Sequence, residues 1–420
     1  MIGDGGSERD LAALVVPRVG GLVALPQGSG EPYRLVDAAG GGVVPVGLFF
    51  RELLASGRSA ATVRSYGMDL LRWWRFLAAV DVGWDCASRV EARDFSCWIQ
   101  ATVKPRRGAG GVPAVGYVAG AANAVTGKAS PGAGYAAATV VHSETVLRAF
   151  YDFHLETGDG PLVNPFPLDR SRRAGRANAH HNPMGEFRRE RSGRYRPRVA
   201  QRIPRGIPDE KFDEIFAALG SDRDRALVAF WISTGARASE LLGMRTGDVD
   251  PGQQLITVTR KGTRAVQQIP ASPDAFVHLR IYQHAMRGLV PTGRDQALWW
   301  TSRRPYRALT YHAAHRMFER VNASLGSNWT LHDLRHAAAR RMAGDPNLPL
   351  MHVQAVMGHA HLTTTERYLA PDRDEVITQV LAHHARQADR RERPSPPPPP
   401  GPGYDPLSLE VLFGRPGTPA

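Results

Sequence analysis

A tyrosine near the C-terminal end of the sequence, Tyr368, follows a series of cationic side chains that could activate it. A phenol has an ordinary pKa of about 10 and is a weak nucleophile at neutral pH. It becomes usable when positive groups hold an electrophile against it. Such groups lie upstream in the order Arg237, Lys261, His332, Arg335 and His359. Two arginines, a lysine and two histidines ahead of a tyrosine fit attack on a phosphodiester better than any other common chemistry.

Arg237 and Lys261 each stand where one predicted element gives way to another. Gly235 can end one helix and leave Arg237 at the start of the next, where its planar guanidinium can grip a phosphate with two N–H groups. Lys261 lies on a turn between two β-rich runs, 255–259 and 265–270, which predicts a hairpin with the lysine reaching outward. Taken singly, each would be an ordinary solvated residue, so only their combination favours a site.

A third motif places several ionisable groups on one predicted helix. His332, Arg335 and His336 share a face, because residues three and four apart are neighbours on a helix. Two histidines four apart could bind a metal, but no glutamate follows in the His-Glu-x-x-His manner and the arginine would repel a divalent cation. We therefore expect no metal site. We expect a phosphate clamp, with His332 and Arg335 directed outward and Leu334 inward.

The last motif joins His359 to Tyr368. Gly358 can turn the chain after the predicted helix 350–357 and free His359 to face a site, and Tyr368 follows nine residues after His359. A lone tyrosine after a helix would be a packed core residue. Tyr368 is therefore a candidate nucleophile only in combination with the cationic groups upstream.

Together these motifs resemble one family, the tyrosine recombinases or phage-type integrases. The resemblance covers about residues 45–385, and its pieces are Thr234 to Leu241, Lys261, His332 to His336, Gly358-His359 and Tyr368. Segments such as 62–77, and 149–153 leading to Asn164-Pro165, are similar to that family's N-terminal domain. The resemblance implies a mainly α fold with a small β-hairpin or sheet. It implies two domains, an α-helical core-binding domain and a mixed, mostly helical catalytic domain.

The resemblance also implies a mechanism, that of a site-specific recombinase or integrase. Tyr368 would attack a DNA phosphate, release a 5′-hydroxyl and leave a 3′-phosphotyrosyl link. Arg237 and Arg335 would bind the nonbridging oxygens and offset the charge that grows there. Lys261 would act as general acid on the departing oxygen. A second strand's 5′-hydroxyl could then reverse the step.

The two histidines complete the implied site and bear on its cofactors. His332 would be the acid/base partner of the tyrosine, and His359 would hydrogen-bond the phosphate. No metal, ATP or other cofactor is implied, since the five groups do what a metal ion does elsewhere. The implied partner is double-stranded DNA, bound by a homotetramer on two sites. Accessory excision or DNA-bending proteins could join it.

Composition and periodicity divide the chain into parts. We expect an N-terminal extension (1–44), a helical core-binding domain (45–160) with a Gly/Ala-rich insertion (104–138), an arginine-rich linker (161–206), a catalytic domain (207–388) and a Pro-rich tail (389–420). Periodicity predicts helices near 46–56, 62–77, 89–103, 143–157, 212–219, 223–235, 273–288, 310–325, 331–344, 350–357, 363–369 and 373–388.

Charge points to a polyanionic partner. The formal net charge is +13 and the pI about 10.2. We expect phosphate contacts from basic residues of the linker and of the start of the insertion, namely Arg172, Arg173, Arg188, Arg189, Arg191, Lys104, Arg106 and Arg107. A flexible, solvated linker is the plainer alternative.

Other sequence features bear on the compartment. The two cysteines lack disulfide or metal spacing, no run approaches the ~18 apolar residues of a membrane span, and the N-terminus lacks the features of a signal peptide. We expect a soluble, cytoplasmic, nucleoid-associated protein with no membrane partner. Two other functions stay open. A type IB topoisomerase uses similar residues as a monomer, and a DNA-binding relic would occupy sites without cleaving, although the intact set of six residues disfavours it.

Overall fold

The computed structural model describes most of the chain, in residues 9–26, 28–104, 119–169, 193–197, 206–359, 361, 365–366, 373–392, 403 and 405–413. It divides into two units. Unit 1 comprises Met1–Arg202, Asp213–Leu219 and His312–Thr330, and unit 2 comprises Ile203–Phe212, Gly220–Tyr311 and Leu331–Ala420.

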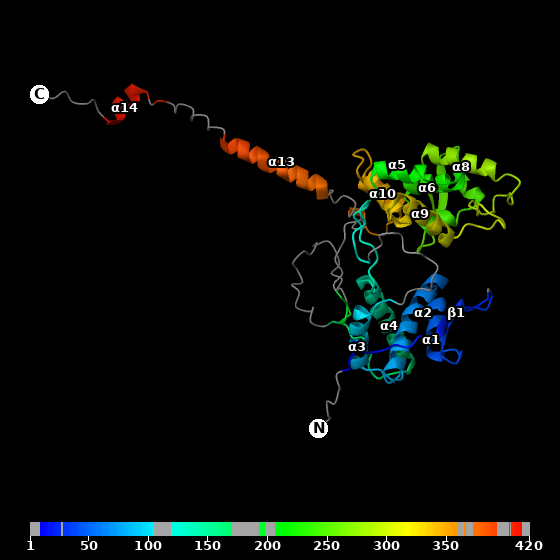
Figure 1. The fold of residues 1–420 in the computed structure, drawn as a ribbon. Coiled ribbons are helices and arrows are strands. Elements are labelled where there is room, and N and C mark those ends of the chain that lie inside the picture. The colour runs from blue at the N-terminus through cyan, green and yellow to red at the C-terminus, as the bar shows by residue number, and fades with distance from the viewer. Residues whose placement is uncertain are drawn as a thin grey trace. The chain divides into compact units, whose positions relative to one another are not determined.

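The N-terminal part of unit 1 consists of helices and a β-hairpin (Figure 1), and many of the side chains in its core are aromatic. Its elements are β1 (Gly21–Ala24), β2 (Tyr33–Val36), α1 (Val44–Ala55), α2 (Ala60–Ala79), α3 (Arg89–Ala101) and α4 (Ala137–Thr157). Trp73 of α2 is fully buried, and its Nε1 donates to the Tyr151 hydroxyl at 2.9 Å. The edges of Phe95 and Phe166 meet the Trp73 ring. Such aromatic contacts fix the angles at which the helices pack.

Local sequence signals set where these helices begin. Ser59 caps α2 by accepting the N–H of Thr62 on its side-chain hydroxyl. Ser88 and Glu91 form a capping box at the start of α3. The expected start of α4 was wrong, because the helix begins at Ala137 rather than at 143. Its first residues are alanines, which favour helix even at the end of a Gly/Ala-rich segment.

The described linker segment 193–197 contacts other parts of unit 1. Gly193 forms an antiparallel bridge with Leu168, and the Tyr195 N–H donates to Oε1 of the buried Glu144 on α4 at 3.1 Å. The segment 193–197 therefore rests on unit 1. The arginines predicted to contact phosphate at 172, 173, 188, 189 and 191 lie outside the described residues.

Unit 2 holds a three-stranded antiparallel sheet and several helices. Its elements are α6 (Asp222–Thr234), α7 (Ala238–Leu242), the 3-10 helix η2 (Thr246–Asp248), β3 (Val249–Asp250), β4 (Leu255–Thr259), β5 (Val266–Pro270), α8 (Pro273–Ala285), α10 (Leu331–Ala343), α11 (Leu350–Met357), α13 (Arg373–Glu392) and α14 (Pro406–Phe413). Two further helices, α5 (Asp209–Ala217) and α9 (Tyr311–Leu325), span the boundaries between the units.

The centre of unit 2 is α6, which packs against α8 and α10. Its side chains are buried almost all round, and Phe230 meets Phe276 and Trp299 edge-on. The strand order is β3-β4-β5, with Ile256 opposite Ile269 and both buried. This buried pair fixes the register of the hairpin that carries Lys261, because a one-residue slip of either strand would turn that strand's isoleucine outward.

The fold confirms the mainly α prediction with a small β-hairpin or sheet. The strand β3 adds to the predicted hairpin, and the expected helix 363–369 lies largely outside the described residues. Among the described residues, no helix has the length and apolar character needed to cross a membrane.

Candidate active site

Arg237 begins α7 directly after a sharp turn at the end of α6. The turn depends on Gly235, whose φ of +60° is left-handed. A Cβ on this residue would also lie only 2.6 Å from Sδ of Met357. Glycine therefore suits this backbone conformation, a side chain here would have to displace Met357, and the turn places Arg237 at the N-terminus of α7 as the sequence predicted.

The carboxylate of Glu240 lies at the centre of the site. It is buried, and its two oxygens accept from the backbone N–H of Arg237 at 2.9 Å, Nη1 of Arg237 at 2.9 Å, Nη1 of Arg260 at 3.1 Å and the backbone N–H of Lys261 at 3.2 Å. Burial alone would raise the pKa of Glu240, but the hydrogen bonds from Arg237 and Lys261 hold it below its usual value. Glu240 was not among the residues predicted to form the site. The signal available was a glutamate three residues after Arg237, at the N3 position of α7.

The hairpin presents two neighbouring cations in different environments. Arg260 is buried, whereas the side chain of Lys261 is exposed. Burial lowers the pKa of Arg260, and the charge of Glu240 offsets part of that effect. The expected outward position of Lys261 on the turn agrees with the structure, whereas Arg260 is a member of the cluster that was not predicted.

Arg335 on α10 is buried rather than outward, contrary to the expectation for this helix. Its Nη1 donates to the carbonyl of Gly235 at 2.6 Å and its Nη2 to that of Met357 at 2.7 Å. These carbonyls lie at the C-terminal ends of α6 and α11, where carbonyls lack partners within the helix and the helix dipole is negative. Two helix ends therefore draw the guanidinium inward. Leu334 is buried as expected.

The C-terminal end of α11 is the point where three arginines meet. Arg260 donates to the carbonyl of Val356, Arg335 to that of Met357, and Arg237 to that of Gly358 at 3.4 Å. The three arginines come from the hairpin, α10 and α7. One helix end thus aligns groups that are far apart in the sequence.

His359 follows directly and contacts the same cluster. Its Nε2 accepts from Nη2 of Arg335 at 3.0 Å, and its Nδ1 lies 2.9 Å from the hydroxyl of the buried Thr365. Burial and then the charges of Arg335, Arg237 and Arg260 lower the pKa of His359 to about 4. The ring is therefore neutral near pH 7, with its proton on Nδ1, which donates to Thr365.

His332 lies on α10 and is exposed, with its ring centroid 4.3 Å from that of His336. Tyr368 lies outside the described residues. The structure thus brings together Arg237, Arg335 and His359 and links the Lys261 backbone to them through Glu240.

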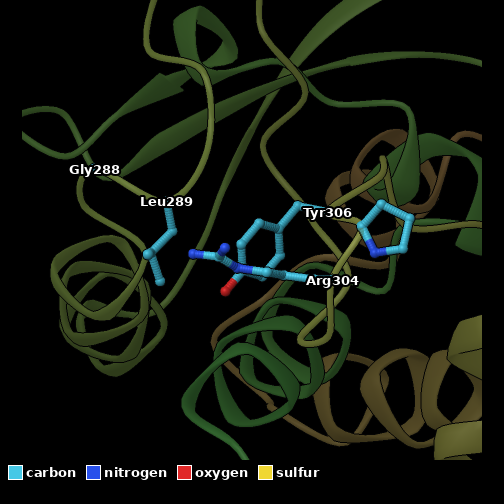
Figure 2. A pocket seen from close by; sticks show the side chains of 5 residues that line it. Gly288, Leu289, Arg304 and Tyr306 are labelled. Atoms are coloured by element: carbon cyan, nitrogen blue, oxygen red, sulfur yellow. The ribbon is translucent and has the colours of Figure 1, made fainter.

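The other predicted DNA contacts are described only in part. Lys104 lies near Tyr135, its Nζ 5.7 Å from the ring centroid, and Arg106 and Arg107 lie outside the described residues. An open pocket of about 580 Å³ lies elsewhere in unit 2, lined by Gly288, Leu289, Arg304, Pro305 and Tyr306. Figure 2 shows the Arg304 side chain extending toward Leu289 beside the Tyr306 ring. This pocket contains none of the six predicted catalytic residues.

Comparison with known proteins identifies the class. Residues 207–375 match the phage integrase family. The matched segment is less than half of the chain, and it is similar to the tyrosine recombinases.

Particular relatives share part of the sequence. The chain is 28% identical to the tyrosine recombinase XerD of Neisseria meningitidis serogroup B over 196 residues, which cover 45% of this chain and 66% of the relative. It is 30% identical to the tyrosine recombinase XerC of Serratia marcescens over 215 residues, 49% of this chain and 66% of the relative. The matched segments thus span just under two thirds of these curated relatives.

Solved structures agree in fold. A Tn1549 transposon integrase in complex with circular intermediate DNA superposes with a TM-score of 0.52 at 16% identity, covering 80% of this chain and 98% of that one. A lambda integrase dimer bound to a COC′ core site gives a TM-score of 0.51 at 14% identity, covering 87% and 81%. Both are tyrosine-recombinase folds of two domains.

Proposed function

We propose that this protein is a site-specific DNA recombinase or integrase that cuts and rejoins DNA strands through a 3′-phosphotyrosyl intermediate. The observation that carries the proposal is the meeting of Arg237, Arg260 and Arg335 at the last carbonyls of α11, next to His359. Positive groups held in advance by buried contacts need little reorganisation when negative charge develops on a phosphate.

In the proposed reaction, Oη of Tyr368 attacks the phosphorus while the bond to the 5′-oxygen breaks. Arg237 and Arg335 bind the nonbridging oxygens and stabilise the charge of the transition state. Lys261 gives a proton to the departing 5′-oxygen, so that a hydroxyl leaves. Rejoining reverses these steps, with the 5′-hydroxyl of another strand as nucleophile.

The two histidines have different proposed parts. His332, exposed on α10, accepts the phenolic proton as Tyr368 attacks. We propose that His359 hydrogen-bonds the phosphate, as the family resemblance implies, once DNA binding moves the ring proton to Nε2, the nitrogen that accepts from Arg335 in the structure without DNA. Its lowered pKa and its bond from Arg335 support a neutral ring that also orients this arginine.

The proposed partner is double-stranded DNA, with a homotetramer on two DNA sites and accessory excision or DNA-bending proteins as further partners. The net charge of +13 supports a polyanionic partner. We propose that Arg172, Arg173, Arg188, Arg189, Arg191, Lys104, Arg106 and Arg107 contribute phosphate contacts. The predicted domain bounds and the nucleoid location are part of the same proposal.

The test is a covalent trapping assay. Duplexes covering the DNA that flanks the gene are nicked next to candidate sites, so that the short 5′-hydroxyl fragment diffuses away after attack. We expect wild type to form a covalent protein–DNA adduct that resists denaturant, and Tyr368→Phe to form none while still binding DNA. An adduct with Tyr368→Phe, or none with wild type under binding conditions, contradicts the assignment.

The same preparation distinguishes the two alternatives. Relaxation of a supercoiled plasmid that lacks any mapped cleavage site indicates a type IB topoisomerase. A footprint on DNA with no adduct under any condition indicates a non-catalytic DNA-binding protein. Pairing of two cleaved sites in one complex supports a recombinase.

A further inference from the structure

Arg260 and Lys261 are neighbours in sequence but occupy opposite environments at the base of the hairpin turn. The Arg260 N–H donates to the carbonyl of Ala265 at 2.8 Å, so Arg260 closes the turn. Arg260 directly follows the last residue of β4, and Lys261 begins the turn, where its backbone N–H donates to Glu240 at 3.2 Å. The Arg260 side chain is only 4% exposed, whereas that of Lys261 is exposed. The contacts that hold Arg260 in place therefore also fix the backbone of the turn and the direction of the Lys261 side chain.

The buried side chain of Arg260 is held from three sides. Its Nη1 donates to Glu240 at 3.1 Å, its Nε donates to Oε1 of Gln267 on β5 at 2.8 Å, and its Nη2 donates to the carbonyl of Val356. The same Gln267 donates through Nε2 to the carbonyl of Ala355 at 3.0 Å. The hairpin is thus joined to α11 by two side chains, and to α7 through Glu240.

Packing reinforces these hydrogen bonds. A Cβ on Gly358 would lie 2.8 Å from Nε and 2.9 Å from Cζ of Arg260, so the guanidinium lies directly over this glycine. Gly358 also has a left-handed φ of +60° and precedes His359. Arg260 therefore connects the segment that carries His359 to the turn that carries Lys261.

We propose that Arg260 is a positioning residue for the reaction, which fixes the hairpin so that Lys261 meets the departing 5′-oxygen. In this proposal the buried Arg260 acts through its neighbour rather than on the DNA itself. The inference rests on the proposed role of Lys261 as general acid.

A change of leaving group separates this role from a merely structural one. An ordinary phosphodiester loses a 5′-hydroxyl, a poor leaving group that needs a proton from the general acid. A 5′-bridging phosphorothiolate loses a thiolate, which leaves without protonation because its conjugate acid is far stronger. A variant that has lost only the positioned acid should recover on the sulfur substrate. A variant with a generally loosened site should not.

The experiment measures adduct formation by Arg260→Gln, Lys261→Ala and wild type on the two substrates, in single turnover at saturating protein. Arg264→Gln is the matched control, because Arg264 is exposed on the same hairpin and the change removes the same charge. We expect Arg260→Gln to slow cleavage of ordinary DNA about 100-fold, the lower range for loss of a general acid. We expect most of that loss to disappear on the phosphorothiolate, as for Lys261→Ala. Arg264→Gln should change the rate by no more than about twofold, as for other surface substitutions.

The outcomes separate the role of Arg260 from that of Lys261. If the rate of adduct formation on the phosphorothiolate recovers for Lys261→Ala but not for Arg260→Gln, the inference about Arg260 is wrong and the role of Lys261 stands. If neither recovers, Lys261 is not the general acid, and both claims fail although adduct formation by Tyr368 stands. DNA binding and circular dichroism identify a misfolded Arg260→Gln. In that case Gln267→Ala serves instead, because it removes one hydrogen bond to Arg260 at a half-buried residue. It must show the same selective recovery on the phosphorothiolate, or the inference fails.

Discussion

Nη2 of Arg335 donates to Nε2 of His359 across 3.0 Å, and the imidazole donates in turn from Nδ1 to Thr365. This chain of hydrogen bonds requires a neutral ring, because a protonated Nε2 could not accept from a guanidinium. The depressed pKa of His359 and the geometry thus have a common cause, the enclosure of the ring beside buried arginines.

The first prediction concerns the titration of His359. Its pKa of about 4 in the folded protein lies below the ordinary 6.5, so the neutral ring stabilises the fold above pH 6.5. That contribution is lost progressively as the pH falls from 6.5 toward 4. We expect an NMR ring resonance that is absent in His359→Gln to titrate near pH 4. A midpoint near 6.5 would contradict the described enclosure.

The second prediction tests the bond between His359 and the buried Thr365. Thr365→Val keeps the shape of the side chain but removes the hydroxyl that accepts from Nδ1. We expect a loss of about 1 kcal/mol in the free energy of unfolding, the usual effect of losing one hydrogen bond, and slower adduct formation. Thr365→Ser retains the hydroxyl and is the control. A loss for Thr365→Ser without a loss for Thr365→Val would show that the methyl group, not the hydrogen bond, matters.

Much of the local architecture was predictable from the sequence because its signals are local. Ser59 caps α2 within one turn, and Gly235 ends α6 through its own backbone freedom. The hairpin around Lys261 followed from two β-rich runs and a glycine-containing turn. Each of these signals lies within a few residues of the feature that it specifies.

The arrangement of the site was not predictable in the same way. Helical periodicity indicated that His332 and Arg335 share a face, but the inward position of Arg335 depends on the carbonyl of Gly235, which is 100 residues away. The pair of Arg260 and Glu240 joins residues 20 apart on different elements. Only the tertiary structure shows which polar groups are buried together, and these contacts override the surface position that an isolated arginine favours.

The third prediction separates two reasons for the glycine at 358. Gly358 and Gly288 both have left-handed φ values, +60° and +74°, but a Cβ would meet Arg260 at 2.8 Å in the first and open space in the second. Alanine at either position has a backbone cost of about 1 kcal/mol. We expect Gly358→Ala to lose a further 1–3 kcal/mol or so through overpacking and to slow adduct formation. If urea unfolding shows equal losses for the two variants, the packing of Arg260 over Gly358 is not significant.

The fourth prediction concerns the linker arginines at 172, 173, 188, 189 and 191. Replacing all five with glutamine should weaken binding to nonspecific duplex DNA. It should also reduce the slope of log K against log salt by about 0.9 for each phosphate that is no longer neutralised. The five-lysine variant keeps the charge and should keep the slope. Fluorescence anisotropy over a salt series measures both, and an unchanged slope in the glutamine variant would favour a linker that does not touch DNA.

The fifth prediction concerns Glu240, whose carboxylate accepts from Arg237, Arg260 and the backbone of Lys261. Glu240→Gln preserves the size of the side chain but removes the negative charge that Arg237 and Arg260 pair with. It also places an amide NH2 group, itself a donor, against N–H groups that need an acceptor. Breaking a buried ion pair in this way costs roughly 3–5 kcal/mol. We therefore expect a large loss in the free energy of unfolding and almost no adduct.

The matched control for Glu240→Gln is Asp222→Asn, which removes a carboxylate that pairs with Arg225 at 3.1 Å on the surface of α6. Its side chain is 41% exposed, so solvent screens the pair and the expected loss is under about 1 kcal/mol. Urea unfolding followed by tryptophan fluorescence measures both variants. Similar losses would show that Glu240 acts as an ordinary ion pair. A large loss for Glu240→Gln alone would show that one carboxylate holds α7 and the hairpin in the arrangement that the proposed chemistry needs.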